Sequence, residues 1–238
     1  MRALAVIPVY NNVATIGDVA ERCRERMEPD VLVIDDGSTD GSGDAARRVG
    51  VAVVDFPENR GKGAAIVRGL EEAASNGYTH VVIVDADGQH MPEEIPRLTD
   101  AAWNQPERIW IGVRRMEGGG VPASSRFGRA MSNFWTTVDS WQRVRDAQSG
   151  FRVYPVTETL SLGCKETGFT FEMEVLVRAA WAGMSIGHVD VDVRYPKEGR
   201  VSHFDMRRDN WAFSRLSFRM FWGMVARAPR LAGRKLLG

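Results

Sequence analysis

Short apolar runs rich in β-branched residues alternate with longer helix-like stretches in the first third of the chain. The strand-like runs lie at residues 3–7, 31–34, 51–54 and 81–84. The helix-like stretches lie at residues 15–27, 41–49 and 62–76. This alternation predicts an α/β fold with a mostly parallel central sheet and helices on both faces.

The alternation is less regular after Trp103. Three consecutive glycines at residues 118–120 predict a mobile loop that could act as a lid. Two further helix-like runs lie at residues 126–144 and 171–180. The chain has 238 residues, of which 44% are hydrophobic, and this is enough for one good-sized core.

The last part of the chain differs from the rest in charge. The whole chain balances 31 Lys and Arg against 31 Asp and Glu, so its net charge predicts no nucleic-acid partner. From Arg207 onward there are seven Arg and one Lys but a single acid, Asp209. Aromatic residues are interspersed with these cations, which predicts an amphipathic helix on an anionic membrane surface. The alternative is a helix that packs on the domain's own core. We therefore expect a catalytic domain at residues 1–206 and a basic tail at residues 207–238.

Other features of the sequence bear on its location. The two cysteines form no CxxC pair, and nothing before Pro8 resembles a secretion signal. The apolar runs at residues 31–34 and 81–84 are far shorter than a spanning helix. We expect a cytoplasmic protein that is peripheral on the cytoplasmic membrane face.

Polar and turn-forming residues follow three of the predicted strands, at residues 8–12, 35–40 and 85–90. In open α/β sheets, ligands bind beyond the carboxyl ends of the strands, so these loops should face one site. The last loop reads Asp-Ala-Asp-Gly-Gln-His. Two carboxylates beside an amide and an imidazole predict a site for Mg²⁺ or Mn²⁺ shared with substrate phosphates, although Asp and Gly also favour a simple turn.

Two other segments carry candidate donor-binding residues. At the end of the second strand, Asp35 and Asp36 could accept hydrogen bonds from a ribose or a base, and Ser38 or Asp40 could cap the next helix. The sequence Arg-Gly-Lys-Gly at residues 60–63 allows close approach of the backbone to a phosphate.

That glycine-containing segment does not match the common phosphate-binding patterns. A P-loop requires Ser or Thr after Gly-Lys, where Gly63 stands, and a dinucleotide fingerprint requires Gly where Ile66 stands. The sequence therefore disfavours an NTPase and a nicotinamide dehydrogenase.

Together these segments resemble the inverting, GT-A-fold glycosyltransferases of family 2. The resemblance covers about residues 1–204 and runs, in order, through Pro-Val-Tyr-Asn-Asn at 8–12, Asp-Asp-Gly-Ser-Thr-Asp at 35–40, Arg-Gly-Lys-Gly at 60–63, Asp-Ala-Asp-Gly-Gln-His at 85–90 and Gln-Ser-Gly-Phe-Arg at 148–152. The Asp-Gly-Gln-His and Ser-Gly-Phe-Arg sequences are most similar to those of dolichyl- and polyprenyl-phosphate sugar transferases.

This resemblance implies transfer of a hexose from a nucleoside-diphosphate sugar, of the GDP-mannose or UDP-glucose type, to a lipid-linked acceptor such as polyprenyl phosphate. The implied nucleotide-sugar-binding residues are Pro8, Tyr10, Asn12 (where these enzymes often carry Glu), Asp36, Lys62, Asp85, Arg200 and His203. The implied metal ligands are Asp87 and Gln89, and the implied acceptor-binding residues are Arg114 and Arg126.

The acceptor decides whether the reaction needs a general base. A lipid phosphate is already an anion, whereas a hydroxyl would need a carboxylate such as Asp146, Glu172 or Glu174. One of the last two could simply point to solvent from its helix. The candidate catalytic residues are therefore Asp85, Asp87, Asp146 and Glu172.

Three other interpretations compete with a polyprenyl-phosphate transferase. The first is transfer to a hydroxyl of another lipid or glycan. The second is a non-catalytic module that binds a nucleotide sugar or a membrane. The third, a sugar nucleotidyltransferase, is disfavoured because residues 8–12 replace its expected glycine-rich, Arg-containing segment.

Overall fold

The computed structural model describes residues 1–27, 30–115, 123–194 and 213–227, with the side chains of residues 123–127 excepted. In this part of the chain, seven strands form one sheet: β1 (Ala3–Val9), β2 (Val31–Asp35), β3 (Ala52–Asp55), β4 (His80–Ile83), β5 (Ile109–Arg114), β6 (Arg152–Pro155) and β7 (Ile186–Val191). The helices are α1 (Val13–Met27), α2 (Ser42–Val49), α3 (Lys62–Ser75), α4 (Ile95–Asn104), α5 (Ala123–Ser140), α6 (Val156–Ser161) and α7 (Phe171–Ala182), with a 3₁₀ turn at Pro92–Glu94 and a C-terminal helix at residues 213–227.

The sheet has the strand order β3-β2-β1-β4-β6-β5-β7. Strands β3, β2, β1 and β4 are parallel to one another, and β5 is parallel to β7. Strand β6 is antiparallel to both of its neighbours. The sheet is thus mostly parallel, as the sequence predicts, and the exception is β6, which lies between two parallel groups.

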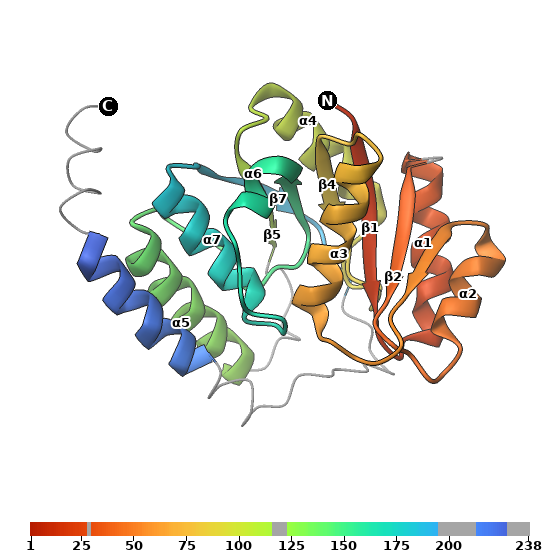
Figure 1. The fold of residues 1–238 in the computed structure, drawn as a ribbon, viewed down its shortest axis with the longest axis horizontal. Coiled ribbons are helices and arrows are strands. Elements are labelled where there is room, and N and C mark those ends of the chain that lie inside the picture. The colour runs from red at the N-terminus through yellow and green to blue at the C-terminus, as the bar shows by residue number, and fades with distance from the viewer. Residues whose placement is uncertain (28–29, 116–122, 195–212, 228–238) are drawn as a thin grey trace.

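Alternate residues of each strand pack on opposite faces of the sheet, because side chains along a strand point alternately to its two sides. In β1, Leu4 and Val6 belong to one core, and Ala5, Ile7 and Val9 belong to the other. The first core is covered by α3, α6, α7 and the C-terminal helix, and the second by α1, α2 and α4. Helices therefore cover both faces (Figure 1), as predicted for strands that are apolar along their whole length.

The C-terminal helix packs on the domain through one face. Leu216 and Met220 are buried and belong to the same core as α3 and α7. Arg219 forms ion pairs with Glu166 and Glu174, at 2.9 and 3.4 Å. The described part of the basic tail is therefore attached to the catalytic domain, while the predicted boundary between residues 206 and 207 lies outside the described residues.

Candidate functional site

The loops that follow β1, β2 and β4 lie together at one edge of the sheet, because these strands are parallel neighbours. The amide of Asn11 donates to Ser38 Oγ at 3.0 Å, and Thr15 Oγ1 donates to the carbonyl of Ala86 at 2.6 Å. Direct hydrogen bonds thus join the first loop to the second, and the first turn of α1 to the third. The prediction that the three loops face one region is confirmed.

The first two loops also fix the start of two helices through Asp40. Its Oδ2 accepts from the amide of Val13 at 2.9 Å, and its Oδ1 accepts from the amide and the hydroxyl of Ser42. The hydroxyl of Ser42 in turn accepts from the amide of Asn12 at 2.9 Å. The N-cap residue of α2 is Gly41, and not Ser38 or Asp40 as the sequence suggested. Asp40, one residue earlier, instead accepts from the first residues of both α1 and α2.

The predicted nucleoside-binding residues surround these hydrogen bonds. Pro8 is buried within β1, Tyr10 is partly exposed, and Asn12 donates from Nδ2 to the carbonyl of Tyr10 at 3.1 Å. Asp36 accepts from the amides of Arg60 and Gly61, at 2.7 and 2.8 Å. Burial raises the pKa of Asp36, although these hydrogen bonds oppose that effect. Asp36 thus positions the Arg-Gly-Lys-Gly turn next to the first two loops.

Lys62, the first residue of α3, forms ion pairs with two carboxylates from distant parts of the chain. Its Nζ lies 2.6 Å from Asp85 Oδ1 and 2.7 Å from Glu172 Oε1. Burial disfavours the charged form of Lys62, but the two carboxylates outweigh it and raise the pKa of the ammonium group. Burial alone would raise the pKa of Asp85, but the charge of Lys62 and the neighbouring His90, whose Nδ1 lies 3.3 Å from Asp85 Oδ2, outweigh it and lower the pKa. Both groups are therefore held in their charged forms.

Gly150 leaves the space that this ion pair requires. A Cβ atom at Gly150 would lie 2.5 and 2.6 Å from the two carboxylate oxygens of Asp85 and 2.6 Å from Lys62 Nζ. A side chain at this position would displace the charged ends of Asp85 and Lys62. The Ser-Gly-Phe-Arg segment thus contacts the Asp-Ala-Asp loop directly, which explains why both belong to one site.

The predicted metal ligands lie beside this ion pair. Asp87 Oδ1 accepts from the amide of Gln89 at 3.0 Å, and Gln89 is buried. Burial and the neighbouring charge of Asp85 raise the pKa of Asp87, and they outweigh the opposing influence of Lys62. Among the described residues, no group of three or more His, Cys, Asp or Glu side chains is arranged to hold a metal. One or two carboxylates completed by substrate phosphates are, however, a common Mg²⁺ site, and the paired Asp85 and Asp87 fit this donor set.

A second buried charge cluster follows β5. Arg114 donates to both carboxylate oxygens of Asp146 at 2.8 Å, and Arg129 Nη1 of α5 lies 3.8 Å from Asp146 Oδ2. Burial would raise the pKa of Asp146, but the two arginines outweigh it and lower the pKa. The structure places the predicted acceptor residue Arg114 against the candidate base Asp146. The sequence did not predict that Arg129 belongs to this cluster.

The expectation that Glu172 or Glu174 points to solvent is wrong, because both are buried. Glu172 is paired with Lys62. Glu174 accepts from the amides of Lys165 and Glu166, at 2.8 and 2.7 Å, and pairs with Arg178 and Arg219. A hydrophobic pattern alone could not show this, because the partners named here, apart from Arg178 in the same helix, come from other segments.

Arg152 has a positioning role that the sequence did not reveal. Its side chain is fully buried and donates to the carbonyls of Ser149, Ala147 and Glu172, at 2.7, 2.7 and 2.5 Å. It therefore links the segment around Gly150 to the first turn of α7. The sequence could have indicated this role, because Arg152 is the last residue of the Ser-Gly-Phe-Arg segment.

Some predicted residues cannot be placed. Arg200, His203 and the glycines at 118–120 lie outside the described residues. Arg126 lies in α5, but its side chain is not described.

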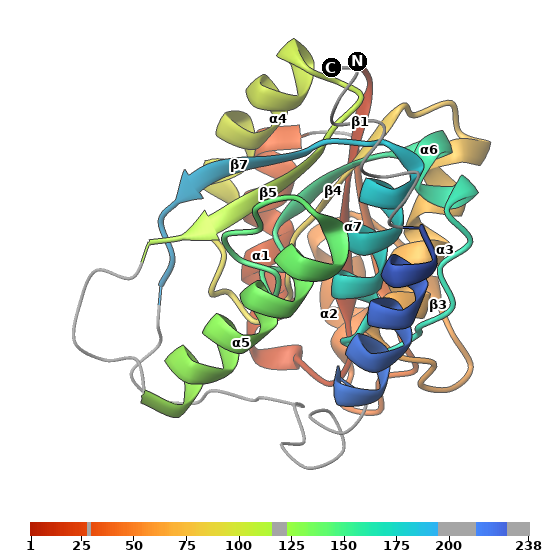
Figure 2. The same ribbon diagram turned by 90° about the vertical axis from the view of Figure 1, so that its left-hand side faces the viewer.

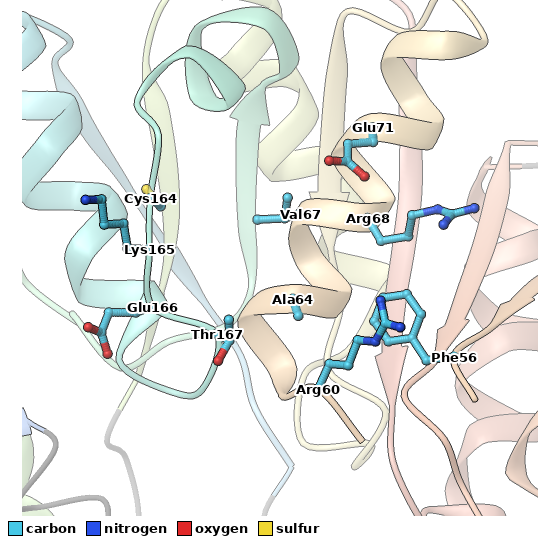
Figure 3. Close-up of a pocket in the computed structure, with 10 residues that line it drawn as sticks. All are labelled: Phe56, Arg60, Ala64, Val67, Arg68, Glu71, Cys164, Lys165, Glu166 and Thr167. Carbon is cyan, nitrogen blue, oxygen red and sulfur yellow. The ribbon is translucent and has the colours of Figure 1, made fainter. Parts of the chain in front are cut away.

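A cavity of about 260 Å³ lies beside the first turns of α3 (Figure 3). Figure 3 shows Arg60 close to Phe56, with its guanidinium 4.9 Å from the ring centre, and Cys164 to Thr167 on the opposite wall. Its lining includes the cations Arg60, Arg68 and Lys165 and the acids Glu71 and Glu166. Arg60 of the Arg-Gly-Lys-Gly segment lines this cavity, but the residues assigned to the nucleotide sugar, the metal and the acceptor do not.

Comparison with known proteins was made for both sequence and fold. Residues 4–164 match the model of "Glycosyl transferase family 2". The chain is 32% identical over 203 residues to an undecaprenyl-phosphate mannosyltransferase of Micrococcus luteus, covering 80% of this chain and 83% of that protein. It is 28% identical over 251 residues to a polyprenol monophosphomannose synthase of Mycolicibacterium smegmatis, covering 98% and 91%.

Among solved structures, the fold is similar to glucosyl-3-phosphoglycerate synthase of Mycobacterium tuberculosis in complex with Mn²⁺, UDP and glucosyl-3-phosphoglycerate. The TM-score is 0.71 at 20% identity, and the match covers 94% of this chain and 79% of that one. The same synthase also gives a match as a complex with Mg²⁺ and UDP.

The mostly parallel sheet, with an Asp-Ala-Asp loop at the carboxyl end of β4, defines a GT-A-fold glycosyltransferase. Within this class, the chain belongs to glycosyl transferase family 2.

Proposed function

We propose that this enzyme transfers a hexose, with inversion, from a nucleoside-diphosphate sugar to a polyprenyl phosphate. The names of its relatives support a lipid-phosphate acceptor, because those proteins are named for undecaprenyl phosphate and polyprenol. The donor is of the GDP-mannose or UDP-glucose type.

The observation that carries the choice of acceptor is the state of the three candidate bases. Asp146, Glu172 and Glu174 are all buried, and each is bound to at least one Arg or Lys side chain. A carboxylate in a buried ion pair is a poor proton acceptor, because protonation would leave its partner's charge uncompensated. A hydroxyl acceptor needs such a base, whereas a phosphate attacks as an anion. The arrangement therefore favours a phosphate acceptor.

The other residues have distinct roles in this proposal. Tyr10, Asn12 and Asp36 line the nucleoside side of the site, and Lys62 holds Asp85 in its ionised form toward the donor. Asp87 and Gln89 would hold Mg²⁺ or Mn²⁺, which stabilises the negative charge of the departing nucleoside diphosphate when bound. Arg114 offers a guanidinium fork to the acceptor phosphate, and Asp146 fixes its orientation.

The test compares two acceptors that differ only in the phosphate. The purified enzyme is assayed with Mg²⁺ or Mn²⁺, a panel of GDP- and UDP-sugars, and either polyprenyl phosphate or the matching polyprenol. We expect transfer to polyprenyl phosphate alone, and a loss of about 10²- to 10³-fold in Asp87→Ala. Transfer to polyprenol with a bell-shaped pH profile would refute the phosphate acceptor. Metal-dependent donor binding without transfer would instead indicate a non-catalytic module.

A further inference from the structure

The backbone on both sides of Asp146 is held by side chains from other elements. Asp146 is fully buried in the segment between α5 and β6, next to the buried Ala147. The amide of Arg145 donates to His188 Nε2 at 3.3 Å, and the carbonyl of Ala147 accepts from Arg152 Nη2 at 2.7 Å. The remaining carbonyl of Arg145 and amide of Ala147 are both bonded to one side chain of α5. Each backbone polar group that flanks Asp146 at these two residues therefore has a partner.

That side chain is Asn133, whose amide bridges the two peptide groups. Its Nδ2 donates to the carbonyl of Arg145 at 2.7 Å, and its Oδ1 accepts from the amide of Ala147 at 2.8 Å. A residue of a neighbouring parallel strand would form the same two bonds. Among side chains, an amide can donate from one end and accept at the other, whereas an ionised carboxylate only accepts. Asn133 thus fixes the backbone of Asp146 relative to α5.

Helix α5 also brings a cation to Asp146. Arg129 precedes Asn133 by four positions, so the two lie on one face of the helix, and Arg129 Nη1 lies 3.8 Å from Asp146 Oδ2. Figure 2 shows α5 in green, together with β5 and β7, on the side of the molecule facing the viewer. Helix α5 has 18 residues, and among the described residues no helix is both long enough and apolar enough to cross a bilayer.

The orientation of Arg114 depends on where Asp146 lies. Arg114, the last residue of β5, donates from Nε and Nη2 to the two oxygens of Asp146, both at 2.8 Å. A carboxylate that holds a guanidinium group through both oxygens fixes its plane. A shift of the Asp146 backbone would therefore turn the guanidinium group of Arg114 as well.

His188 of β7 holds the same segment from the other side. Burial, together with the charges of Arg145 and Arg143, lowers the pKa of His188 to about 4. The ring is therefore neutral near pH 7, and its Nε2 accepts from the amide of Arg145. The segment is held between α5 and β7, and Asn133 provides the two bonds that flank Asp146 directly.

We propose that Asn133 is a positioning residue of the acceptor site: by bridging the peptide groups on both sides of Asp146, its amide sets the orientation of Arg114 toward the acceptor phosphate. Asn133 itself touches neither substrate. This inference rests on the proposed function, because the role of Arg114 toward the acceptor belongs to that proposal.

Steady-state kinetics of Asn133→Ala test the proposal, with polyprenyl phosphate in detergent micelles. We expect the KM for the acceptor to rise at least about tenfold, while kcat stays within about twofold and the KM for the donor is unchanged. Asn133→Asp keeps the shape of the side chain and its acceptor but loses the donor at neutral pH, so it should raise the acceptor KM as well. A merely structural role would lower the folded fraction, which reduces kcat and leaves KM unchanged. An acceptor KM that stays at the wild-type value in both variants would overturn the proposal.

The matched control is Thr137→Val, also on α5. Thr137 Oγ1 accepts from the amide of Val144 at 3.0 Å, so this variant removes another hydrogen bond between the same helix and the same segment. That bond does not flank Asp146. We expect the acceptor KM of Thr137→Val to stay within about twofold of the wild type, even where the variant loses stability. An equal rise in both variants would mean that any loosening of the segment has this effect, and would overturn a specific role of Asn133.

Thermal unfolding tests the link from Asn133 to Arg114 without any substrate. Part of the stability lost in Asn133→Ala should come from the weakened pair of Arg114 with Asp146. The drop in Tm should therefore be smaller, by at least about 2 °C, when Asn133→Ala is introduced into Arg114→Met instead of the wild type. Additive drops in Tm would overturn the positioning role, whatever the transferase assay gives. Coupled drops in an enzyme that transfers nothing to polyprenyl phosphate would refute the proposed function, while the link from Asn133 to Arg114 would stand.

Discussion

Buried charge is compensated differently in two regions of the molecule. One is the edge of the sheet with the candidate site, and the other is the layer formed by α5 and the C-terminal helix. In the first region, the carboxylates of the partly buried Asp85 and the fully buried Asp146 each have a cation within 2.8 Å. In the second, Asp139 is 1% exposed, its Oδ1 has no hydrogen-bond partner among the described residues, and burial raises its pKa to about 6. The second layer also exposes Phe134, Phe218 and Trp222.

This difference separates two kinds of surface. The paired charges of the first region are fixed in position by their partners, and we infer that this region is preorganised to bind a charged donor. The helical layer instead keeps a buried acid whose pKa is raised, together with large apolar side chains exposed on its outer side.

The largest effect is expected when the buried ion pair of the first region loses its cation. Lys62→Met would leave Asp85 and Glu172 facing each other, at a cost of about 3 to 5 kcal/mol in the free energy of unfolding. Arg47→Met, which removes an exposed pair with Asp44 and Asp55, should cost less than about 1 kcal/mol. Urea unfolding, monitored by tryptophan fluorescence, measures the stability of both variants. Equal losses of stability would contradict the comparison between the two regions.

A smaller loss is expected from adding one methyl group at Gly150. Gly150→Ala forces its Cβ against Asp85 and Lys62, which should cost about 1 to 3 kcal/mol and weaken donor binding. The control is Gly168→Ala, where the added Cβ meets no atom within 4 Å. Calorimetric titration with the donor and thermal unfolding give the two readouts. Unimpaired donor binding in Gly150→Ala would show that the site accommodates the methyl group.

The unpaired acid of the helical layer predicts a pH dependence. Because the pKa of Asp139 is raised in the fold, its contribution to stability is largest below the unfolded pKa and is lost as the pH rises through about 6. Asp139→Asn should therefore stabilise the protein by about 1 kcal/mol at pH 8 and change little at pH 4. Urea midpoints at the two pH values measure this, with Asp100→Asn on the surface of α4 as the control. A gain that is the same at both pH values would contradict the assignment.

The smallest effect is expected on the outer side of the helical layer. Phe134→Ser and Phe218→Ser remove exposed side chains, so each should change the free energy of unfolding by less than about 0.5 kcal/mol. Met220→Ser, on the buried side of the same C-terminal helix, should cost several-fold more. Thermal unfolding of the three variants measures these changes. If the two phenylalanine variants lost as much stability as Met220→Ser, this interpretation would be refuted.

Much of the fold and some of the site could be predicted from local patterns. The strand and helix order from β1 to β4 follows from apolar runs and helical spacing, and the three polar loops meet because parallel strands end at one edge. The contact of Asp40 with the start of α2 could be anticipated because it joins residues two positions apart, whereas its contact with Val13 joins two loops. These features are local or follow from the rules of parallel sheets.

The sequence by itself determined the α/β class, the family and which loops meet at one edge of the sheet. Only the tertiary structure decided which charges pair: Lys62 with Asp85 and Glu172, and Arg114 with Asp146. It also decided that Glu172 and Glu174 are buried, and that α5 and the C-terminal helix flank α7. The reason is physical. Helical and strand patterns show which positions of one segment are buried. An ion pair depends instead on how two segments are placed in space, and these segments lie up to 110 residues apart in the sequence.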